Sequence, residues 1–384
     1  MIQTNNRIGN ILVDYTPDFY RRALRNYRNG DYKDLIALFE QTELDSHVMG
    51  CIEGREDGYK RDWRLTEASS APRDIGIKDF VESVFMSINM RDLEDNIFDA
   101  RKKKYVVIDL NWDIMQWNGE SKQSIKPLKI NQKYFRYDLK DNKLKLDFGF
   151  QLKEIPEDAA LIVESIKAPI LIPVARDFIL KEFGLESFAS FLETFGEPFI
   201  IGFYPPGSDT AFKNAVDEAV KNMAASSRGT APSGTTFEIK ETQRGSADHD
   251  KFIEIAKKGI AVSILGHENA VSNQPGLQVG ENQAPYKASR AKTIADIFFI
   301  EEAIYRLVKM LVDRNFDSVQ KYPVFSIDKS EPINVDARLK IIDSAYAKGY
   351  EVLADEFALL GLKKSDTQAP ILKRDFNNPA DAGF

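Results

Sequence analysis

Cysteine is almost absent from this chain of 384 residues, in which Cys51 is the only one. A single thiol excludes an intrachain disulfide and any metal site built from several cysteines. Cys51 lies in an apolar stretch and fits a small buried side chain. Histidine is also scarce: the three histidines stand far apart, at positions 47, 249 and 267. None has the H-x-x-x-H spacing of a helical zinc site, so we predict no metal centre.

Long apolar runs are missing as well. No uninterrupted apolar stretch reaches the length of about 18 residues that would suggest a membrane-spanning helix. The first residues, Met1–Arg7, contain no apolar core of a signal peptide. We therefore expect an intracellular protein without a membrane span.

Motifs of phosphate binding and nucleophilic catalysis are absent. The chain contains no G-x-x-x-x-G-K-[ST], no G-x-G-x-x-G and no G-x-S-x-G. The acidic pairs Glu301-Glu302 and Glu40/Glu43 fit solvated helix faces. His267 follows a predicted helix end, where it could cap the helix, stand in the loop or bind a ligand. We predict no catalytic residue and no cofactor.

The net charge is −7, so no global positive field attracts nucleic acid. Two basic clusters are local exceptions. Residues Arg101–Lys104 fit a solvated turn before a strand, or else a contact to phosphate or to an acidic partner. Lys287, Arg290 and Lys292 fall at the start of a predicted helix, where cations are unfavourable by roughly a few tenths of a kcal/mol. Surface solubility is the simpler explanation of this second cluster.

The first half of the chain predicts an α+β domain. Short alternating stretches separated by turns, such as Asp141-Asn142, indicate a mostly antiparallel sheet. Stretches with apolar residues at i, i+3 and i+4 indicate helices. We expect helices at 17–28, 32–41, 45–60 and 77–88, and strands at 62–66, 105–112, 128–130, 134–138, 143–148 and 160–163.

The second half predicts long helices around a small insert. The strand–helix–strand order within 199–242 indicates a compact β-α-β insert. The loop 266–285 has no apolar period and is long for a compact domain, so it should be functional or disordered. Residues 364–384 should form an extended tail. We expect helices at 173–195, 209–225, 248–265, 286–313, 336–348 and 352–360, and strands at 199–204, 235–242 and 323–327.

Two of these helices have informative faces. In the helix 248–265, the face of Phe252, Ala256, Gly259 and Ser263 consists mostly of small side chains, which let another backbone approach closely. This face could pack inside the chain or against a neighbouring subunit. The helix 286–313 is apolar around most of its girth and should be a buried spine. Its apolar residues are Ile294, Ile297, Phe298, Ile300, Ile304, Leu307, Val308, Leu311 and Val312.

Several short motifs accompany this order of elements. Asp45, His47, Arg55 and Trp63 form a D-x-H…R…W pattern, and Trp112 ends the strand that follows. The remaining motif residues are Pro169, Arg176, Lys181, the stretch FLETFGEP at 191–198, GFY at 202–204, ILG at 264–266 and ASRA at 288–291. Between about residues 40 and 360, the chain thereby resembles the Mu-like portal proteins of tailed bacteriophages.

The sequence departs from this family in two places. Family members often have Gln-Thr-Leu-Thr-Thr after Ile-Leu-Gly, whereas this chain has His-Glu-Asn-Ala-Val at 267–271. The loop conformation of relatives therefore does not transfer. Many members also have a longer C-terminal region, which implies a reduced crown in this chain.

The resemblance implies a ring, usually of twelve subunits, at one vertex of the capsid. It also implies a portal fold with wing, stem, clip and crown. The implied parts are the wing with an N-terminal arm (1–172, arm 1–16), the first stem helix (173–196), the clip (197–246), the second stem helix (247–265), the tunnel loop (266–285), the spine helix and strand of the wing (286–330), and the crown with the C-terminal tail (331–384).

The resemblance further implies a conduit for double-stranded DNA without sequence specificity and without chemistry of its own. Its implied partners are the large terminase, the major capsid protein and the head–tail connector. Its implied location is the virion, and the host cytoplasm during assembly. The implied site residues are Gln274, Gln278, Asn282, Gln283, Lys287 and Arg290 in the DNA channel, Phe252, Ala256, Gly259 and Ser263 between subunits of the stem, and Arg228, Lys240 and Arg244 as clip contacts.

Two other functions are compatible with the sequence. One is a non-enzymatic oligomeric scaffold or adaptor outside a phage head, in which residues 248–313 fold back on themselves within one chain. The other is an enzyme of unrecognised class that uses acidic residues or His267. A convergent pocket of titratable groups with shifted pKa values would indicate the enzyme.

Overall fold

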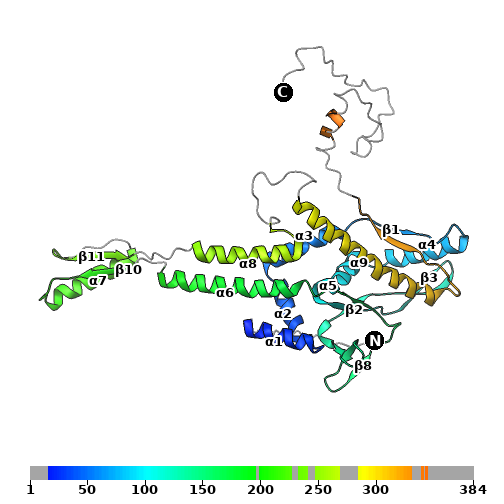
Figure 1. Cartoon of the computed structure of the whole chain (residues 1–384), viewed down its shortest axis with the longest axis horizontal. Coiled ribbons are helices and arrows are strands. Elements are labelled where there is room, and N and C mark those ends of the chain that lie inside the picture. The colour runs from blue at the N-terminus through cyan, green and yellow to red at the C-terminus, as the bar shows by residue number, and fades with distance from the viewer. Residues whose placement is uncertain are drawn as a thin grey trace, which may run out of the picture. The chain divides into compact units, whose positions relative to one another are not determined.

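The structure is a computed structural model that describes residues 16–195, 199–226, 232–240, 247–268, 284–330, 339–340 and 342–344. The chain divides into two compact units, Met1–Asp328 and Lys329–Phe384 (Figure 1). In the second unit the described residues include two short helical pieces, at 339–340 and 342–344. Most of the predicted crown, and all but the last residue of the predicted arm at 1–16, lie outside the described residues.

Three helices begin the described part of the first unit. The side chain of Thr16 caps the first helix and accepts a hydrogen bond from Phe19 N at 3.2 Å. The carboxylate of Asp45 caps the third helix and accepts from the amides of His47 and Val48, both at 3.1 Å. Each such cap stabilises a helix by about 1 kcal/mol. The three predicted helices are confirmed, with bounds α1 (Pro17–Arg28), α2 (Lys33–Glu43) and α3 (Ser46–Tyr59).

Two more helices follow, α4 (Pro72–Met86) and α5 (Met90–Lys103). Helix α5 was not predicted, because its buried face includes the charged residues Glu94 and Asp99, which interrupt the apolar period. The helix ends in Arg101, Lys102 and Lys103, and cations are favourable in a last turn. The basic cluster is therefore the end of a helix, and the prediction of a solvated turn was wrong.

The strands of the first unit form small antiparallel sheets in the part of the chain that the structure describes. The central strand β2 pairs with β5 on one side and β9 on the other. The predicted strand 105–112 is shorter than expected, because the backbone turns at Asn111, which has a φ of +40°. The strands are β1 (Trp63–Thr66), β2 (Tyr105–Asp109), β3 (Asp113–Trp117), β4 (Glu120–Ser124), β5 (Leu128–Ile130), β6 (Phe135–Asp138), β7 (Lys143–Asp147), β8 (Leu152–Glu154), β9 (Ala160–Glu164) and β12 (Val324–Ile327).

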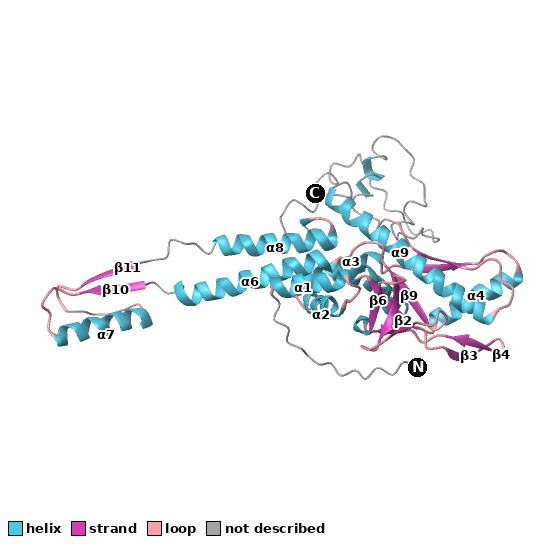
Figure 2. Cartoon of the chain, turned by 60° about the horizontal axis from the view of Figure 1, so that its bottom comes forward, coloured by secondary structure: helices cyan, strands magenta, loops and turns pink. Residues whose placement is uncertain are grey.

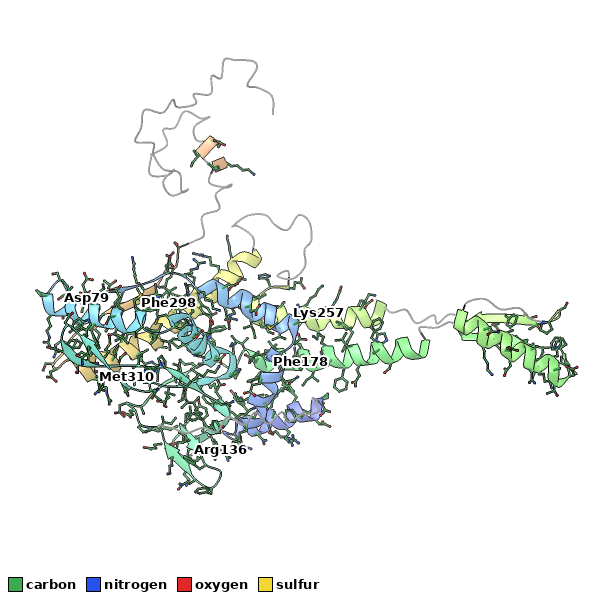
Figure 3. All side chains as sticks on the ribbon, turned by 180° about the vertical axis from the view of Figure 1, so that it is seen from behind. Asp79, Arg136, Phe178, Lys257, Phe298 and Met310 are labelled. Atoms are coloured by element: carbon green, nitrogen blue, oxygen red, sulfur yellow. The ribbon has the colours of Figure 1, made fainter. Side chains whose placement is uncertain are left out.

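Three long helices dominate the second half: α6 (Leu171–Phe195), α8 (Ala247–Leu265) and α9 (Ala284–Asn315). Helices α6 and α8 lie side by side, as Figures 1 and 2 both show. Helix α9 is largely the predicted spine, although the ring of Phe298 is 57% exposed (Figure 3). Its fully buried residues join α4, α5, β2 and β9 in one apolar core: Ile297, Ile300, Ile304, Leu307, Val308, Leu311 and Val312.

The predicted β-α-β insert is present. Its strands β10 (Phe199–Phe203) and β11 (Thr236–Lys240) pair antiparallel, and helix α7 (Thr210–Ser226) lies between them in sequence. A Cβ at Gly202 would lie 2.8 Å from Val216 Cγ1 and 3.0 Å from Val220 Cγ2. The missing side chain at 202 therefore lets α7 pack closely against this strand.

Candidate functional site: the junction of helices α3, α6, α8 and α9

Helices α6 and α8 approach each other at two glycines. A Cβ at Gly259 of α8 would overlap the carboxylate of Asp177 on α6. A Cβ at Gly184 of α6 would lie 2.9 Å from Phe252 Cδ1 on α8. Both contacts are closer than Cβ atoms normally allow, so a larger residue at either position would require the Asp177 or Phe252 side chain to shift. The two helices are thereby held in one antiparallel register.

These contacts occupy the face of α8 that was a candidate for packing between subunits. Ala256 is 4% exposed, and Gly259 lies against Asp177 of the same chain. Phe252 covers Gly184 and keeps 42% of its surface exposed. The backbone carbonyl of Ser263 accepts a hydrogen bond from Lys292. Ala256 and Gly259 therefore pack inside the chain, while contact of this face, with Phe252 and Ser263, to a neighbouring subunit stays a prediction.

The start of α3 is bonded to both α6 and α8. The carboxylate that caps α3, Asp45, also forms an ion pair with Lys181 of α6, and both side chains are 7% exposed. His47 Nε2 lies 3.0 Å from the backbone carbonyl oxygen of Lys257 on α8. Because a carbonyl can only accept, this ring nitrogen is the donor. Phe178 and Lys257, which Figure 3 labels, mark the two long helices at this level.

The middle of α3 is bonded to α8 and α9 through Arg55. Its Nε donates to Asp296 Oδ2 at 2.8 Å and its Nη2 to Asp296 Oδ1 at 3.1 Å. Its Nη1 donates to the backbone carbonyl of Ile264, in the last turn of α8. The Asp296 side chain is fully buried, and that of Arg55 is 4% exposed. Arg101 Nη2 also lies 3.5 Å from Asp296 Oδ1. Removing Asp296 would leave the buried Arg55 charge without a carboxylate, which costs about 3–5 kcal/mol.

Lys292 joins the end of α8 to α9. Its Nζ donates to the carbonyl oxygens of Val262 at 3.2 Å and Ser263 at 3.1 Å. A cation at a helix C-terminus satisfies carbonyls that have no partner within the helix. Burial, and then repulsion from Arg55, lowers the pKa of Lys292 to about 8. Lys292 is therefore a structural contact, and its assignment to surface solubility was wrong.

The described residues that border the segment 269–283 are Glu268, just after α8, and Ala284, the first residue of α9. Helix α8 ends at Leu265 and is followed by Gly266, whose φ is +93°, a value that L side chains rarely adopt. Burial, and then Lys292, lowers the pKa of His267, and its buried Nδ1 has no hydrogen-bond partner among the described residues. Lys287 is exposed and Arg290 is half-buried on the first turns of α9. The predicted channel residues Gln274, Gln278, Asn282 and Gln283 lie outside the described residues.

The other predicted contact residues are the three clip residues and the basic cluster Arg101–Lys104. Arg228 and Arg244 lie outside the described residues, and Lys240 belongs to β11, where its backbone pairs with Phe199. The cluster Arg101–Lys104 is interior: Lys102 lies 3.1 Å from Glu56, and Lys103 lies 2.6 Å from Glu43. Neither a solvated turn nor a phosphate contact describes it.

Among the described residues, no group of histidine, cysteine and carboxylate side chains could hold a metal ion, and no helix is long and apolar enough to cross a membrane. Cys51 is buried, and burial together with the nearby Asp45 raises its thiol pKa to about 11. A thiol with that pKa stays protonated at neutral pH and is a poor nucleophile. The contacts described at the junction join helices, and the Cys51 thiol is not activated as a nucleophile.

The motif residues at this junction are part of a wider similarity. A sequence model of the family described as "Portal protein of Mu bacteriophage" matches residues 36–359. The chain belongs to this family of portal proteins. The D-x-H…R pattern of the family is the part of α3 that bonds to the long helices, through Asp45, His47 and Arg55.

Individual portal relatives are distant. The portal protein of Escherichia phage Mu is 24% identical over 351 residues, which cover 84% of this chain and 66% of the Mu protein. The Mu-like prophage FluMu protein gp29 of Haemophilus influenzae is 22% identical over 400 aligned residues, which cover 95% of this chain and 74% of that protein. The chain thus spans slightly less than two thirds of the length of the phage Mu portal protein.

Solved structures show the portal fold at still lower identity. A chain of the virion of a native gene transfer agent particle has a TM-score of 0.55 at 11% identity, covering 91% of this chain and 100% of its own. A chain in the neck of a native gene transfer agent particle, computed with C12 symmetry, has a TM-score of 0.51 at 10% identity, covering 90% and 94%. The predicted fold, an α+β portal fold, is confirmed.

Proposed function

We propose that this protein forms the portal ring at one vertex of a phage capsid. The ring would consist of about twelve copies and would stand in the virion after assembly in the host cytoplasm. The observation that carries the proposal is the family match over 36–359. Three of the motif residues, Asp45, His47 and Arg55, bond to α6, α8 and α9 at the junction. The neck structure with C12 symmetry supports a ring for a protein of the same fold.

The channel of the ring would pass double-stranded DNA during packaging and ejection. In this proposal α6 and α8 form the stem, and the segment 269–283, which connects α8 to α9 in sequence, lines the channel together with Lys287 and Arg290. Its residues Gln274, Gln278, Asn282 and Gln283 are neutral and polar. Neutral groups add no salt-dependent affinity for phosphates, so duplex DNA could slide in both directions.

The remaining surfaces would serve assembly. The insert with β10, α7 and β11 would be the clip, facing the large terminase and later the head–tail connector, with Arg228, Lys240 and Arg244 as its basic groups. The wing would contact the major capsid protein. The protein would have no catalytic activity, because the packaging motor supplies the chemistry.

Electron microscopy of the purified full chain tests this proposal against an oligomeric scaffold or adaptor. A portal predicts closed rings with a central hole, and labelling of the protein in particles should place it at one vertex. Rings absent under all conditions, together with absence from particles, would contradict the proposal. A protein that assembles without a central hole would favour the adaptor.

A further inference from the structure

Helices α6 and α8 bury the sides that pack against the rest of the chain, and each helix keeps one side exposed. On α8, the buried residues Ile253, Ala256, Ile260 and Ile264 recur at helical spacing and pack inward. The opposite side of α8 carries the basic row, which we define as Lys251, Ile255, Lys258 and Val262. These residues recur at intervals of four, three and four, so they lie on one face.

The basic row exposes apolar surface. Ile255 is 68% exposed and Val262 is 48% exposed, although both belong to a well-formed helix. Lys251 and Lys258 alternate with them and form no ion pair with any residue that the structure describes. An exposed apolar row with charged neighbours is typical of a contact surface. Asp250 and Glu254 flank the row without being part of it.

Helix α6 carries a row of the opposite charge. Lys181 and Gly184 face the chain's own helices, because Lys181 pairs with Asp45 and Gly184 lies under Phe252. The outward side carries the acidic row, which we define as Glu182, Phe183 and Glu186. Glu182 is 49% exposed and lies 3.6 Å from Lys181 of the same helix. Phe183 is 42% exposed, and Glu186 has no ion-pair partner in the described part of the chain.

We propose that the acidic row of one copy packs against the basic row of the next copy around the ring. This inference rests on the portal function proposed above. The two rows lie on different helices and have opposite charge, so they fit a head-to-tail contact that repeats until the ring closes. A contact between two identical rows would place like charges together, which selects against that pairing.

The register of α6 against α8 identifies the residues that should meet. Gly184 lies at the level of Phe252. Helix α8 runs antiparallel to α6, so the residue two positions after Gly184 lies beside the residues one or two positions before Phe252. Glu186 is therefore at the level of Asp250 and Lys251. Copies related by a ring axis keep the same level, so Glu186 of one copy should meet Lys251 of its neighbour. Exposed ion pairs add little affinity, so the charges select the partner while Ile255 and Phe183 supply apolar contact.

Charge reversal tests this interface. We expect Glu186→Lys and Lys251→Glu, each made in the full chain, to raise the concentration needed for assembly by about tenfold at low salt. The double variant Glu186→Lys/Lys251→Glu should restore assembly, because it exchanges the two charges. Lys257→Glu, the same change on an exposed α8 residue outside the row, is the matched control and should assemble normally. Light scattering after size-exclusion chromatography measures assembly, and thermal melting confirms that each variant is folded.

The outcomes separate this interface from the portal function. Restoration by the double variant, with the single variants impaired, supports the interface. If both single variants form rings as readily as the unaltered chain, or if the double variant stays impaired, the interface is overturned while the ring itself stands. If the unaltered chain never forms a ring, the portal function and the interface are both overturned.

Discussion

The α3–α6–α8–α9 junction and the outer faces of the α6–α8 pair both contain charged residues, but they use them in opposite ways. At the junction, Asp296 and Arg55 are buried and bonded to each other. On the outer faces, Glu186 and Lys251 are exposed and have no partner among the described residues. We infer from this difference that the charges at the junction control the stability of one subunit. Outer charges should control how subunits recognise one another.

The largest expected effect comes from Asp296→Ala. It leaves the Arg55 guanidinium buried without its carboxylate, so we expect a loss of about 3–5 kcal/mol in the free energy of unfolding. Chemical denaturation of the unassembled subunit measures this loss. The control Glu302→Ala changes an exposed carboxylate on the same helix and should shift stability by about 0.5 kcal/mol or less. Equal losses of stability in the two variants would show that the buried Arg55–Asp296 pair contributes no more than an exposed carboxylate does.

Glu94 of α5 is also a buried carboxylate, but unlike Asp296 it is poorly paired. Burial, opposed by Arg91 at 3.4 Å, raises its pKa from 4.5 to about 7, and its Oε1 has no hydrogen-bond partner. Because the folded-state pKa is raised, the ionised form is disfavoured, and stability should fall as pH rises from about 4.5 through 7. Asp95 and Lys60 are the other charges that act on this group.

We expect Glu94→Gln to remove this loss and to stabilise the subunit at pH 8 by up to roughly 3 kcal/mol, at about 1.4 kcal/mol per pKa unit. Denaturation of both proteins at pH 5 and pH 8 tests the sign. A stability difference that stays constant between the two pH values would refute the assignment to Glu94.

Gly259→Ala should have a smaller effect. Its added Cβ meets the Asp177 carboxylate within the same chain, and overpacking of this kind costs about 1–3 kcal/mol. The matched control is Gly54→Ala, since Gly54 is exposed on α3 with no atom within 4 Å of a Cβ at that position. That change should stabilise the helix by up to about 1 kcal/mol. A normal melting temperature for Gly259→Ala, combined with lost assembly, would instead place a second copy against this face.

The smallest expected effect on stability belongs to Lys287→Gln, on an exposed residue of α9. We expect a shift of about 0.5 kcal/mol or less in the free energy of unfolding. If Lys287 contacts a DNA phosphate in the channel, the slope of log affinity against log salt should decrease by about one. Fluorescence anisotropy with a short duplex measures that slope. An unchanged slope would remove Lys287 from the proposed channel contacts.

Residue pattern was sufficient for the long helices but not for α5. The apolar periods of 173–195 and 248–265 predicted α6 and α8 closely, because apolar residues on one side of each helix face the core. In α5, the charges of Glu94 and Asp99 are buried, so the apolar period was broken and the helix was missed. The hairpin of β3 and β4 was missed despite Asn118-Gly119, a strong turn signal whose residues adopt φ values of +50° and +81°.

The motif residues of the candidate site could be predicted from the sequence, but the residues that they contact could not. Asp45, His47 and Arg55 were identified through the family pattern, but their partners Lys181 and Asp296 are 136 and 241 residues away in sequence. Pairings over such distances leave no local periodicity. The small face at Gly259 indicated close packing correctly. Whether its partner was the same chain or a neighbour depended on the position of Asp177 in space.

The mass and shape of the assembled full chain test the portal assignment most directly. Native mass spectrometry of the purified protein, together with images of the same sample, gives both. The proposed ring predicts a closed cyclic oligomer of about twelve copies of the 43.6 kDa chain around a central hole. A single species at 43.6 kDa, under every condition that keeps the subunit folded, would contradict it.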